Sequence, residues 1–259
     1  MGQKELLIVI PAHNEAQNLP RVLDQLAEQE VDRYADILVV DDASTDDTLG
    51  IARERGGRTV SNIFRFGYGG AVQMGYKYAV RGGYSFVVQM DADGQHDACN
   101  VPVLCRRLWE RDREGLRPDI VLGSRYLEGS RSFSLSWAKR VAHRLFRWLI
   151  RSATGQTVTD PTTGLQGLSR RAFSFYARYG NFDDKYPDAN MLAQMALLSF
   201  RVAEVPAVMY PRTAGRSIHS GLRPVWYMVR MVYSLAAVVF RIRVLKKEIM
   251  PAPEALTGR

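Results

Sequence analysis

The strongest constraint on the fold is an alternation of short β-rich runs with helical patterns over the first half of the chain. The β-rich runs cover residues 6–10, 37–40, 59–60, 86–90 and 120–122, and helical spacing occupies about 19–30, 46–55, 70–80 and 99–113. Such alternation is typical of βαβ units around a largely parallel sheet. No low-complexity linker interrupts it, so we predict one α/β domain over residues 1–220, Rossmann-like, with a mostly parallel central sheet flanked by helices.

The composition excludes several other classes of protein. Of 259 residues, 46% are hydrophobic and only two are cysteines, Cys99 and Cys105. A disordered chain, a disulfide framework and a zinc cluster are therefore excluded. The first apolar run, 6–10, is too short for a secretory leader, so we expect the protein in the cytoplasm.

The net charge of +8 is concentrated in two segments. Residues 129–159 carry six Lys or Arg and no acid, residues 205–247 carry eight and no acid, and the remaining chain has 21 basic against 27 acidic residues. In the first segment, an inserted basic amphipathic helix is predicted within 131–153. Its arginines share one stripe, and large apolar residues lie on the other side: Arg140, Arg144, Arg147 and Arg151 against Trp137, Val141, Leu145, Trp148 and Leu149.

The second basic segment predicts a C-terminal amphipathic helix with a tail, residues 221–259. Arg223, Arg230, Ser234 and Arg241 fall near one meridian of that helix. The longest uncharged run, 231–240, spans only about 15 Å against about 30 Å of hydrocarbon. We therefore predict a helix that lies in the plane of an anionic membrane surface rather than crossing it. The alternative is that both basic helices pack on the body and point their arginines to water.

The loop after the first strand excludes a common nucleotide site. Its sequence, Pro11-Ala12-His13-Asn14-Glu15, contains no glycine, whereas a dinucleotide-binding enzyme needs a glycine fingerprint there. A second glycine-rich stretch, 67–70, lacks the spacing of a phosphate-binding loop. For that stretch we predict a tight turn with close helix packing.

Two adjacent carboxylates, Asp41 and Asp42, close the second strand. Ser44 or Thr45 is expected to cap the following helix, which leaves both aspartates without a local role. Adjacent carboxylates at a sheet edge are costly unless donors meet them, such as a nucleobase N–H or ribose hydroxyls.

The sharpest motif follows a buried strand: Asp91-Ala92-Asp93-Gly94-Gln95-His96. Its oxygen ligands, from Asp91, Asp93 and Gln95, favour Mg²⁺ or Mn²⁺, and Mg²⁺ is usually bound by one or two carboxylates plus substrate phosphates. His96 is either a ligand or base, or a structural histidine at the edge of the site.

Arginines follow other strand ends. Arg125 lies in Gly-Ser-Arg-Tyr at 123–126, and Arg212 and Arg216 precede the C-terminal helix; a turn at 160–164 begins with Asp160. The planar guanidinium suits bidentate binding of phosphate.

Taken in order, these motifs resemble glycosyltransferase family 2 of the GT-A fold, in its dolichyl-phosphate mannose synthase-like branch. The resemblance spans residues 5 to about 218 and rests on Pro-x-x-Asn-Glu, Val-Asp-Asp-x-Ser-x-Asp-x-Thr, Asp-x-Asp-Gly-Gln-His, Gly-Ser-Arg-Tyr and Asp-x-x-x-Gly. It implies metal-dependent, inverting transfer of a sugar from a nucleotide diphosphate donor, a UDP- or GDP-sugar, to a polyprenyl phosphate at the cytoplasmic membrane face.

The resemblance also implies roles for individual residues. The nucleotide sugar would be held by Pro11, His13, Glu15, Asp42, Asp91 and Ala92, and the metal by Asp91, Asp93 and Gln95. The acceptor phosphate would meet Arg125, Arg212 and Arg216, with Asp93, Arg125 and Arg212 as the catalytic set. Two positions depart from the family: His13 stands where tyrosine is common, and Ile218 where a basic residue is common. The family's optional C-terminal membrane pair is missing, which implies interfacial docking or a small membrane subunit.

Two other functions remain open from the sequence. A saccharide or protein hydroxyl acceptor would require a carboxylate base, for which Asp160, Asp183, Asp184 and Asp188 are available, whereas a phosphate acceptor is already anionic. The basic segments could instead belong to a non-enzymatic lipid- or nucleic-acid-binding module. Because no nucleic-acid motif is found and the body is acidic, we expect no nucleic acid partner.

Overall fold

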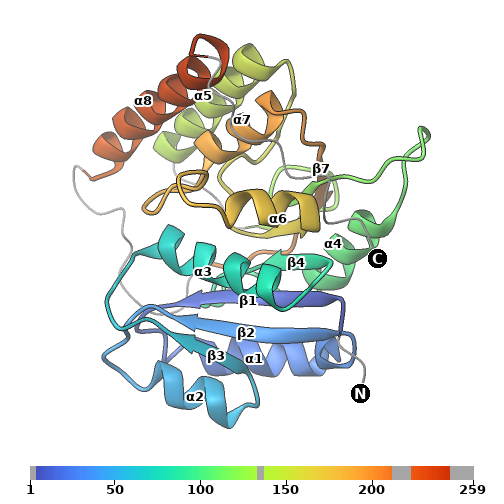
Figure 1. Ribbon diagram of the computed structural model, residues 1–259, viewed down its shortest axis with the longest axis vertical. Helices are drawn as coiled ribbons and strands as arrows, with labels where there is room; N and C mark the ends of the chain where they lie inside the picture. Colours follow the sequence, from blue (N-terminus) through green and yellow to red (C-terminus); the bar gives the residue numbers. More distant parts are fainter. Residues whose placement is uncertain (1–3, 133–136, 212–222, 246–259) are drawn as a thin grey trace.

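A seven-stranded mixed sheet forms the centre of the protein, whose computed structural model describes residues 4–132, 137–211 and 223–245 (Figure 1). The strand order is β3-β2-β1-β4-β6-β5-β7. All strands run parallel except β6, which is antiparallel to both of its neighbours. The strands are β1 Leu6–Ala12, β2 Ala35–Asp41, β3 Arg58–Ser61, β4 Phe86–Gln89, β5 Ile120–Ser124, β6 Gln166–Ser169 and β7 Val202–Pro206.

Helices connect the strands as the alternating pattern predicts, so the predicted α/β architecture is confirmed. Every strand and helix predicted in the first half is present, with ends shifted by a few residues. The elements β6, β7, α6 and α7 were not predicted. The helices are α1 Leu19–Glu28, η1 Val31–Arg33 (3₁₀), α2 Thr48–Glu54, α3 Tyr68–Arg81, α4 Asn100–Trp109, α5 Trp137–Thr154, α6 Arg170–Tyr176, α7 Ala189–Leu197 and α8 Arg223–Arg243.

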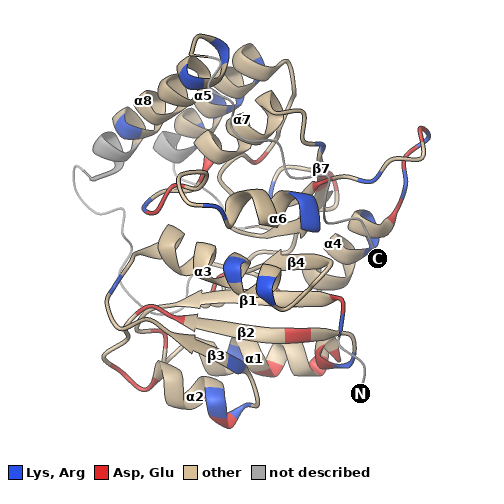
Figure 2. Ribbon diagram, viewed as in Figure 1, with Lys and Arg blue, Asp and Glu red and all other residues tan. Residues whose placement is uncertain are grey.

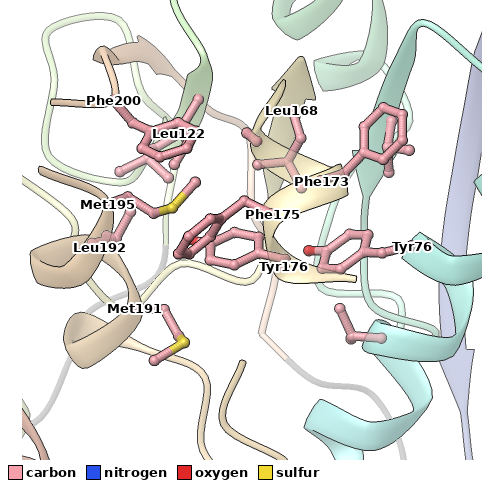
Figure 3. Packing of buried hydrophobic residues seen from close by; sticks show 14 of the residues in the cluster. Tyr76, Leu122, Leu168, Phe173, Phe175, Tyr176, Met191, Leu192, Met195 and Phe200 are labelled. Atoms are coloured by element: carbon pink, nitrogen blue, oxygen red, sulfur yellow. The ribbon is translucent and has the colours of Figure 1, made fainter. Parts of the chain in front are cut away.

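The sheet buries both of its faces. Because side chains alternate along a strand, Leu7 and Val9 of β1 join the core under α3 and α6, whereas Ile8 and Ile10 join the core under α1 and α4. The first core is rich in aromatic side chains, among them Tyr76 and Tyr176, whose rings stack with centroids 5.8 Å apart (Figure 3). This double-sided burial holds the carboxyl ends of the parallel strands at one common edge.

A further layer of helices, α5, α7 and α8, packs beyond α6 (Figure 1). Phe146 and Ile150 of α5 are buried there, as are Met231, Leu235 and Val238 of α8. The two basic helices are therefore attached to the body along one apolar line each. Within the described residues, no helix combines the length and hydrophobicity needed to span a bilayer.

Three members of the polar meridian predicted for α8 contact the body of the protein, beside its buried apolar line. Arg230 stacks over the ring of Tyr186 at 4.8 Å, Ser234 accepts a hydrogen bond from Asn190 at 2.9 Å, and Arg241 donates to Gln194; the side chain of Arg223 lies outside the described part. The side of α8 opposite the buried Met231, Leu235 and Val238 exposes apolar residues to solvent: Val229, Val232, Tyr233 and Phe240.

On α5 the predicted stripe is present in part. Arg140, Arg144 and Arg151 are exposed, and we call them the exposed α5 arginines. Arg147 instead turns inward over the ring of Tyr126, at 4.2 Å from the ring centroid. Beside the exposed arginines, Val141, Leu145 and Trp148 also face solvent. Figure 2 shows this concentration of basic residues on α5 and α8, whereas acidic residues recur around the ends of β1 to β3.

Candidate active site

The loop after β1 is fixed against the loop after β2. His13 Nδ1 lies 2.8 Å from the carbonyl oxygen of Asp42. Asn14, at φ 56°, donates its backbone N–H to the Ser44 hydroxyl and accepts the backbone N–H of Thr45 on its side-chain oxygen. Glu15 is tied down through its backbone N–H, which donates to Thr48, and its carboxylate accepts from Asn18 at 2.7 Å. Pro11 is buried in β1, so of the predicted nucleotide residues here only His13 and Glu15 are partly exposed at the edge.

Ser44 and Thr45 do not cap α2, contrary to the prediction. Both are occupied by Asn14, and α2 begins later, at Thr48. The backbone N–H of Thr48 instead donates to Asp46 at 3.1 Å. The helix start is thus stabilised by an acidic residue two positions upstream.

Protein donors meet both carboxylates at the end of β2. Asp42 accepts hydrogen bonds from Asn62 Nδ2 (3.0 Å) and from the backbone N–H groups of Phe66 (2.9 Å) and Gly67 (2.8 Å). Asp41 accepts from Ser61 and from the backbone of Ser44. No ligand is therefore needed to satisfy them, and Asp42 anchors the segment that leads into α3.

The Asp91-x-Asp93 motif leaves β4 at the same edge, with its second carboxylate locked by a local turn. Asp93 Oδ1 accepts from the backbone N–H of Gln95 at 3.0 Å, and the Gln95 amide donates to the carbonyl of Tyr210 at 3.3 Å. Ala92 is buried between the two acids. The side chains predicted to hold the metal are thus placed on one short, braced loop.

His96 is a structural residue of this loop. Its Nδ1 accepts the backbone N–H of Asp91 at 3.1 Å, so its remaining proton is on Nε2, which lies 3.8 Å from Asp91 Oδ2. Burial lowers the pKa of His96 to about 4, which keeps the ring neutral at pH 7. The structural interpretation of His96 left open by the sequence is the one this geometry favours.

Tyr68 and Gly164 hold Asp91 from two sides. The Tyr68 hydroxyl donates to Asp91 Oδ1 at 2.8 Å and accepts from Gln89 at 2.9 Å. Burial and the Asp91 carboxylate raise the pKa of Tyr68 well above its ordinary value, so it remains a donor. A Cβ on Gly164 would stand 2.7 Å from Asp91 Oδ2, closer than real Cβ atoms approach. Tyr68 thus orients the carboxylate, and the absence of a side chain on Gly164 leaves room for it.

The predicted tight turn at 67–70 is confirmed. Gly67 has φ 86°, which an L side chain rarely adopts, and a Cβ on Gly69 would lie 2.1 Å from the carbonyl oxygen of Asp183. Close packing at the start of α3 is what puts Tyr68 beside Asp91.

Arg125, at the end of β5, is held by Asp160. Its Nε and Nη2 each donate to one carboxylate oxygen at 2.7 Å, and its backbone N–H donates to Oδ2 at 3.0 Å. Burial alone would lower the pKa of Arg125, but the bonds to Asp160 and its charge raise it above the ordinary value. Hydrogen bonds among the described residues use Nε and Nη2 and leave Nη1 of the guanidinium available.

The basic helix α5 reaches this same pair. His143 Nδ1 lies 3.9 Å from Asp160 Oδ1, and its ring packs against Tyr126 at 5.5 Å between centroids. Arg147 of the same helix stacks over the Tyr126 ring, 4.2 Å from its centroid. Helix α5 is therefore part of the wall beside Arg125, which sequence spacing did not indicate.

Two predicted acceptor residues, Arg212 and Arg216, lie outside the described residues, as does Ile218. Two of the four carboxylates considered as bases for a hydroxyl acceptor are engaged in structural bonds. Asp160 binds Arg125, and Asp183 accepts from the backbone of Lys185 and Tyr186 and from Asn190.

The oxygen atoms of the Asp91-x-Asp93 loop fit a hard divalent cation whose remaining coordination positions are filled by the substrate. In the described part of the chain, no group of three or more His, Cys, Asp or Glu side chains forms a metal cage. Mg²⁺ usually keeps several water ligands and is bound by one or two carboxylates plus the phosphate oxygens of a substrate. Two carboxylates and an amide on one loop agree with that mode of binding.

The model of one family, Glycosyl transferase family 2, matches residues 7–176. The chain belongs to this family, and it is a glycosyltransferase. The resemblance deduced from the motifs is confirmed.

Among its relatives is the undecaprenyl-phosphate mannosyltransferase of Micrococcus luteus, 31% identical over 235 residues, which cover 83% of this chain and 88% of the relative. The polyprenol monophosphomannose synthase of Mycolicibacterium smegmatis is 29% identical over 222 residues, covering 83% and 81%. Among solved structures, glucosyl-3-phosphoglycerate synthase of Mycobacterium tuberculosis, in complex with Mn²⁺, UDP and phosphoglyceric acid, matches with a TM-score of 0.65 at 21% identity. That match covers 91% of this chain and 78% of the other, and it supports the predicted GT-A fold alone.

Proposed function

We propose that the protein transfers a monosaccharide from a nucleotide diphosphate sugar to a polyprenyl phosphate at the cytoplasmic face of a membrane, with inversion at the anomeric carbon. The observation that carries the proposal is the pairing of two groups at one sheet edge. The Asp91-x-Asp93 loop suits a metal-bound diphosphate, and a clamped arginine, Arg125, follows the end of β5. The names of the two bacterial relatives, a mannosyltransferase for undecaprenyl phosphate and a polyprenol monophosphomannose synthase, agree with this substrate class.

The donor would bind along the ends of β1, β2 and β4. We assign the nucleoside to Pro11, His13, Glu15 and Asp42, with the exposed edge of His13 against the base. Since Asp42 is already bonded to Asn62, Phe66 and Gly67, its contribution is to fix the wall of this pocket through the 62–67 segment. Ala92 would contribute close backbone approach to the sugar diphosphate.

Asp91, Asp93 and Gln95 would hold Mg²⁺ or Mn²⁺ against the donor diphosphate. The ion would neutralise the charge that gathers on the departing nucleoside diphosphate. The contribution of this chain is geometric: Tyr68, Gly164 and the Gln95 backbone fix both carboxylates before the donor arrives. Such preorganisation removes reorganisation cost from the reaction step.

Arg125 would orient the acceptor phosphate, with Arg212 and Arg216 as further candidates from the segment that follows β7. Asp160 anchors two nitrogens of Arg125, Nε and Nη2, so the direction of Arg125 Nη1 is fixed. A phosphate monoester is anionic at neutral pH, so the nucleophile needs no base to activate it. The structural engagement of Asp160 and Asp183 favours this acceptor over a saccharide or protein hydroxyl.

The membrane contact would be made by the outer faces of α5 and α8. Trp148 and Tyr233 are 63% and 75% exposed, and further apolar residues surround them on each helix. An apolar face of this kind, flanked by the exposed α5 arginines, suits insertion at the boundary between headgroups and acyl chains. A small membrane subunit that covers the same face is the alternative partner.

An acceptor comparison tests the proposed function. The purified protein is incubated with Mn²⁺ and each of a panel of radiolabelled UDP- and GDP-sugars, together with a short-chain polyprenyl phosphate or, separately, with free sugars. We expect one donor to give a lipid-extractable product with the polyprenyl phosphate alone.

Asp93→Ala serves as the site variant and Asp24→Ala, an exposed residue of α1, as the matched control. Loss of transfer in the first and its retention in the second would support the assignment. Transfer to free sugars without transfer to polyprenyl phosphate would refute the proposed acceptor.

A further inference from the structure

Glu204 lies in the middle of β7, the strand at one edge of the sheet, opposite Leu122 of β5. Its carboxylate accepts three hydrogen bonds from a single turn. The donors are the backbone N–H of Thr159 (2.8 Å), the Thr159 hydroxyl (2.9 Å) and the backbone N–H of Asp160 (3.0 Å). Glu204 therefore holds the residues immediately before and at the start of the Asp-x-x-x-Gly turn.

The turn that Glu204 holds is the one that holds Arg125. Asp160 grips Arg125 through both carboxylate oxygens, and Thr159 Oγ1 also lies 2.6 Å from Ser124 Oγ, next to Arg125 in the chain. Two routes of hydrogen bonds thus lead from Glu204 to Arg125.

Glu204 itself is separated from the reacting groups. It borders a groove of about 560 Å³ on the far side of the turn, shared with Arg107, Asp112, Glu114 and Arg201. From that position it does not reach the ends of β1 and β4, where the donor is assigned. Any effect of Glu204 on the reaction must therefore pass through the Thr159–Asp160 turn.

We propose that Glu204 is a positioning residue of the acceptor phosphate site: by fixing the Thr159–Asp160 turn it fixes the direction of the Arg125 guanidinium. This inference rests on the proposed function, which assigns the acceptor phosphate to Arg125. A carboxylate is required because three donors converge on it and it offers acceptors alone. A glutamine keeps one acceptor oxygen and turns an NH₂ toward the remaining donor, which leaves a partly buried donor without a partner.

The test is Glu204→Gln, with steady-state kinetics for both substrates. We expect KM for a short-chain polyprenyl phosphate to rise about tenfold, the typical effect of losing one charge-assisted hydrogen bond, and KM for the nucleotide sugar to change less than twofold. Glu204→Asp, which keeps the charge, should recover part of the loss. Glu114→Gln is the matched control, because Glu114 borders the same groove and its carboxylate bonds Arg201 rather than the Thr159–Asp160 turn. Both KM values should remain unchanged in this variant.

A double variant separates positioning from general destabilisation. In the Arg125→Lys background, where the bidentate grip is absent, Glu204→Gln should raise the acceptor KM less than twofold further. Equal rises in donor and acceptor KM, or a full tenfold rise in the Arg125→Lys background, would overturn the proposal. If Glu204→Gln does not fold, Thr159→Val replaces it with the same expectations, since it removes the hydroxyl bonds to Glu204 and Ser124.

The outcome is distinct from a failure of the proposed function. If the parent protein does not transfer sugar to polyprenyl phosphate, the function is wrong. If the parent transfers sugar and Glu204→Gln matches Glu114→Gln, the positioning role alone is wrong.

Discussion

The pairing of Asp160 with Arg125 predicts a large loss of stability when the aspartate loses its charge. The Asp160 side chain is fully buried and that of Arg125 is 14% exposed. Replacing Asp160 by Asn changes the volume little, so no cavity contributes to the loss. What remains is a buried guanidinium that has lost its anion, which typically costs about 3–5 kcal/mol.

An exposed ion pair provides the control. Asp112 bonds Arg201 at 3.0 Å, but these two side chains are 37% and 41% exposed. Exposed pairs contribute about 1 kcal/mol or less because water screens them. Asp112→Asn should therefore cost several-fold less stability than Asp160→Asn.

Urea denaturation followed by tryptophan fluorescence measures the difference. With an m-value of about 3 kcal/mol/M, Asp160→Asn should lower the transition midpoint by about 1 M or more, and Asp112→Asn by about 0.3 M or less. In a double-mutant cycle with Arg125→Met, the double variant should lose less stability than the two single variants lose together. Equal midpoints for the two asparagine variants would refute the reasoning that burial makes this pair strong.

Three further results are expected. Gly164→Ala places a Cβ 2.7 Å from Asp91 Oδ2 and 3.1 Å from the Tyr68 hydroxyl, so it should reduce transfer about 100-fold, as an ångström-scale misplacement does; parental kcat/KM would contradict this. Burial raises the pKa of Cys105 to about 12, and burial with the Asp97 hydrogen bond raises that of Cys99 to about 11. Both thiols should therefore resist a disulfide reagent at pH 8 until the chain unfolds, and rapid labelling of the native protein would contradict this expectation. Replacing the three exposed α5 arginines by glutamine should weaken binding to anionic vesicles about 100-fold, at about 1 kcal/mol each; unchanged co-sedimentation would show that they only face water.

The sequence predicts the edge of the sheet well because the responsible signals are local. A run of apolar residues that ends at a polar residue, Asp41, Asp91 or Arg125, predicts both a buried strand and the position of its carboxyl end. In a parallel sheet the carboxyl ends share one edge, so motifs as far apart in the chain as Asp41 and Arg125 could be placed together before the structure was known.

What the sequence does not predict depends on distant contacts. The sequence shows no local partner for Asp42 because two of its donors, Phe66 and Gly67, are backbone N–H groups more than 20 residues away. Strand β6, Gln166–Ser169, is antiparallel and follows a turn rather than a helix, so the βα alternation does not indicate it. Glu204 and Thr159 are 45 residues apart, and nothing in either segment alone indicates the other.

The orientation of α8 shows a different limit. Its surface is apolar on two sides, so periodicity identifies the helix without telling which side is buried. The choice is made by polar partners on and near α7, since Asn190 and Gln194 meet Ser234 and Arg241. Arg230, Ser234 and Arg241 consequently contact the body, and the apolar side opposite the buried line is left to solvent.

The central claim is that Asp91 and Asp93 hold a divalent ion on the donor diphosphate. Electron paramagnetic resonance of Mn²⁺, titrated into the protein with UDP or GDP, measures this directly. The account predicts that the signal of free Mn²⁺ falls when parent protein and one of the nucleotides are both present, and that it does not fall with folded Asp91→Asn or Asp93→Asn variants. Equal Mn²⁺ binding by the parent and by both variants would contradict it.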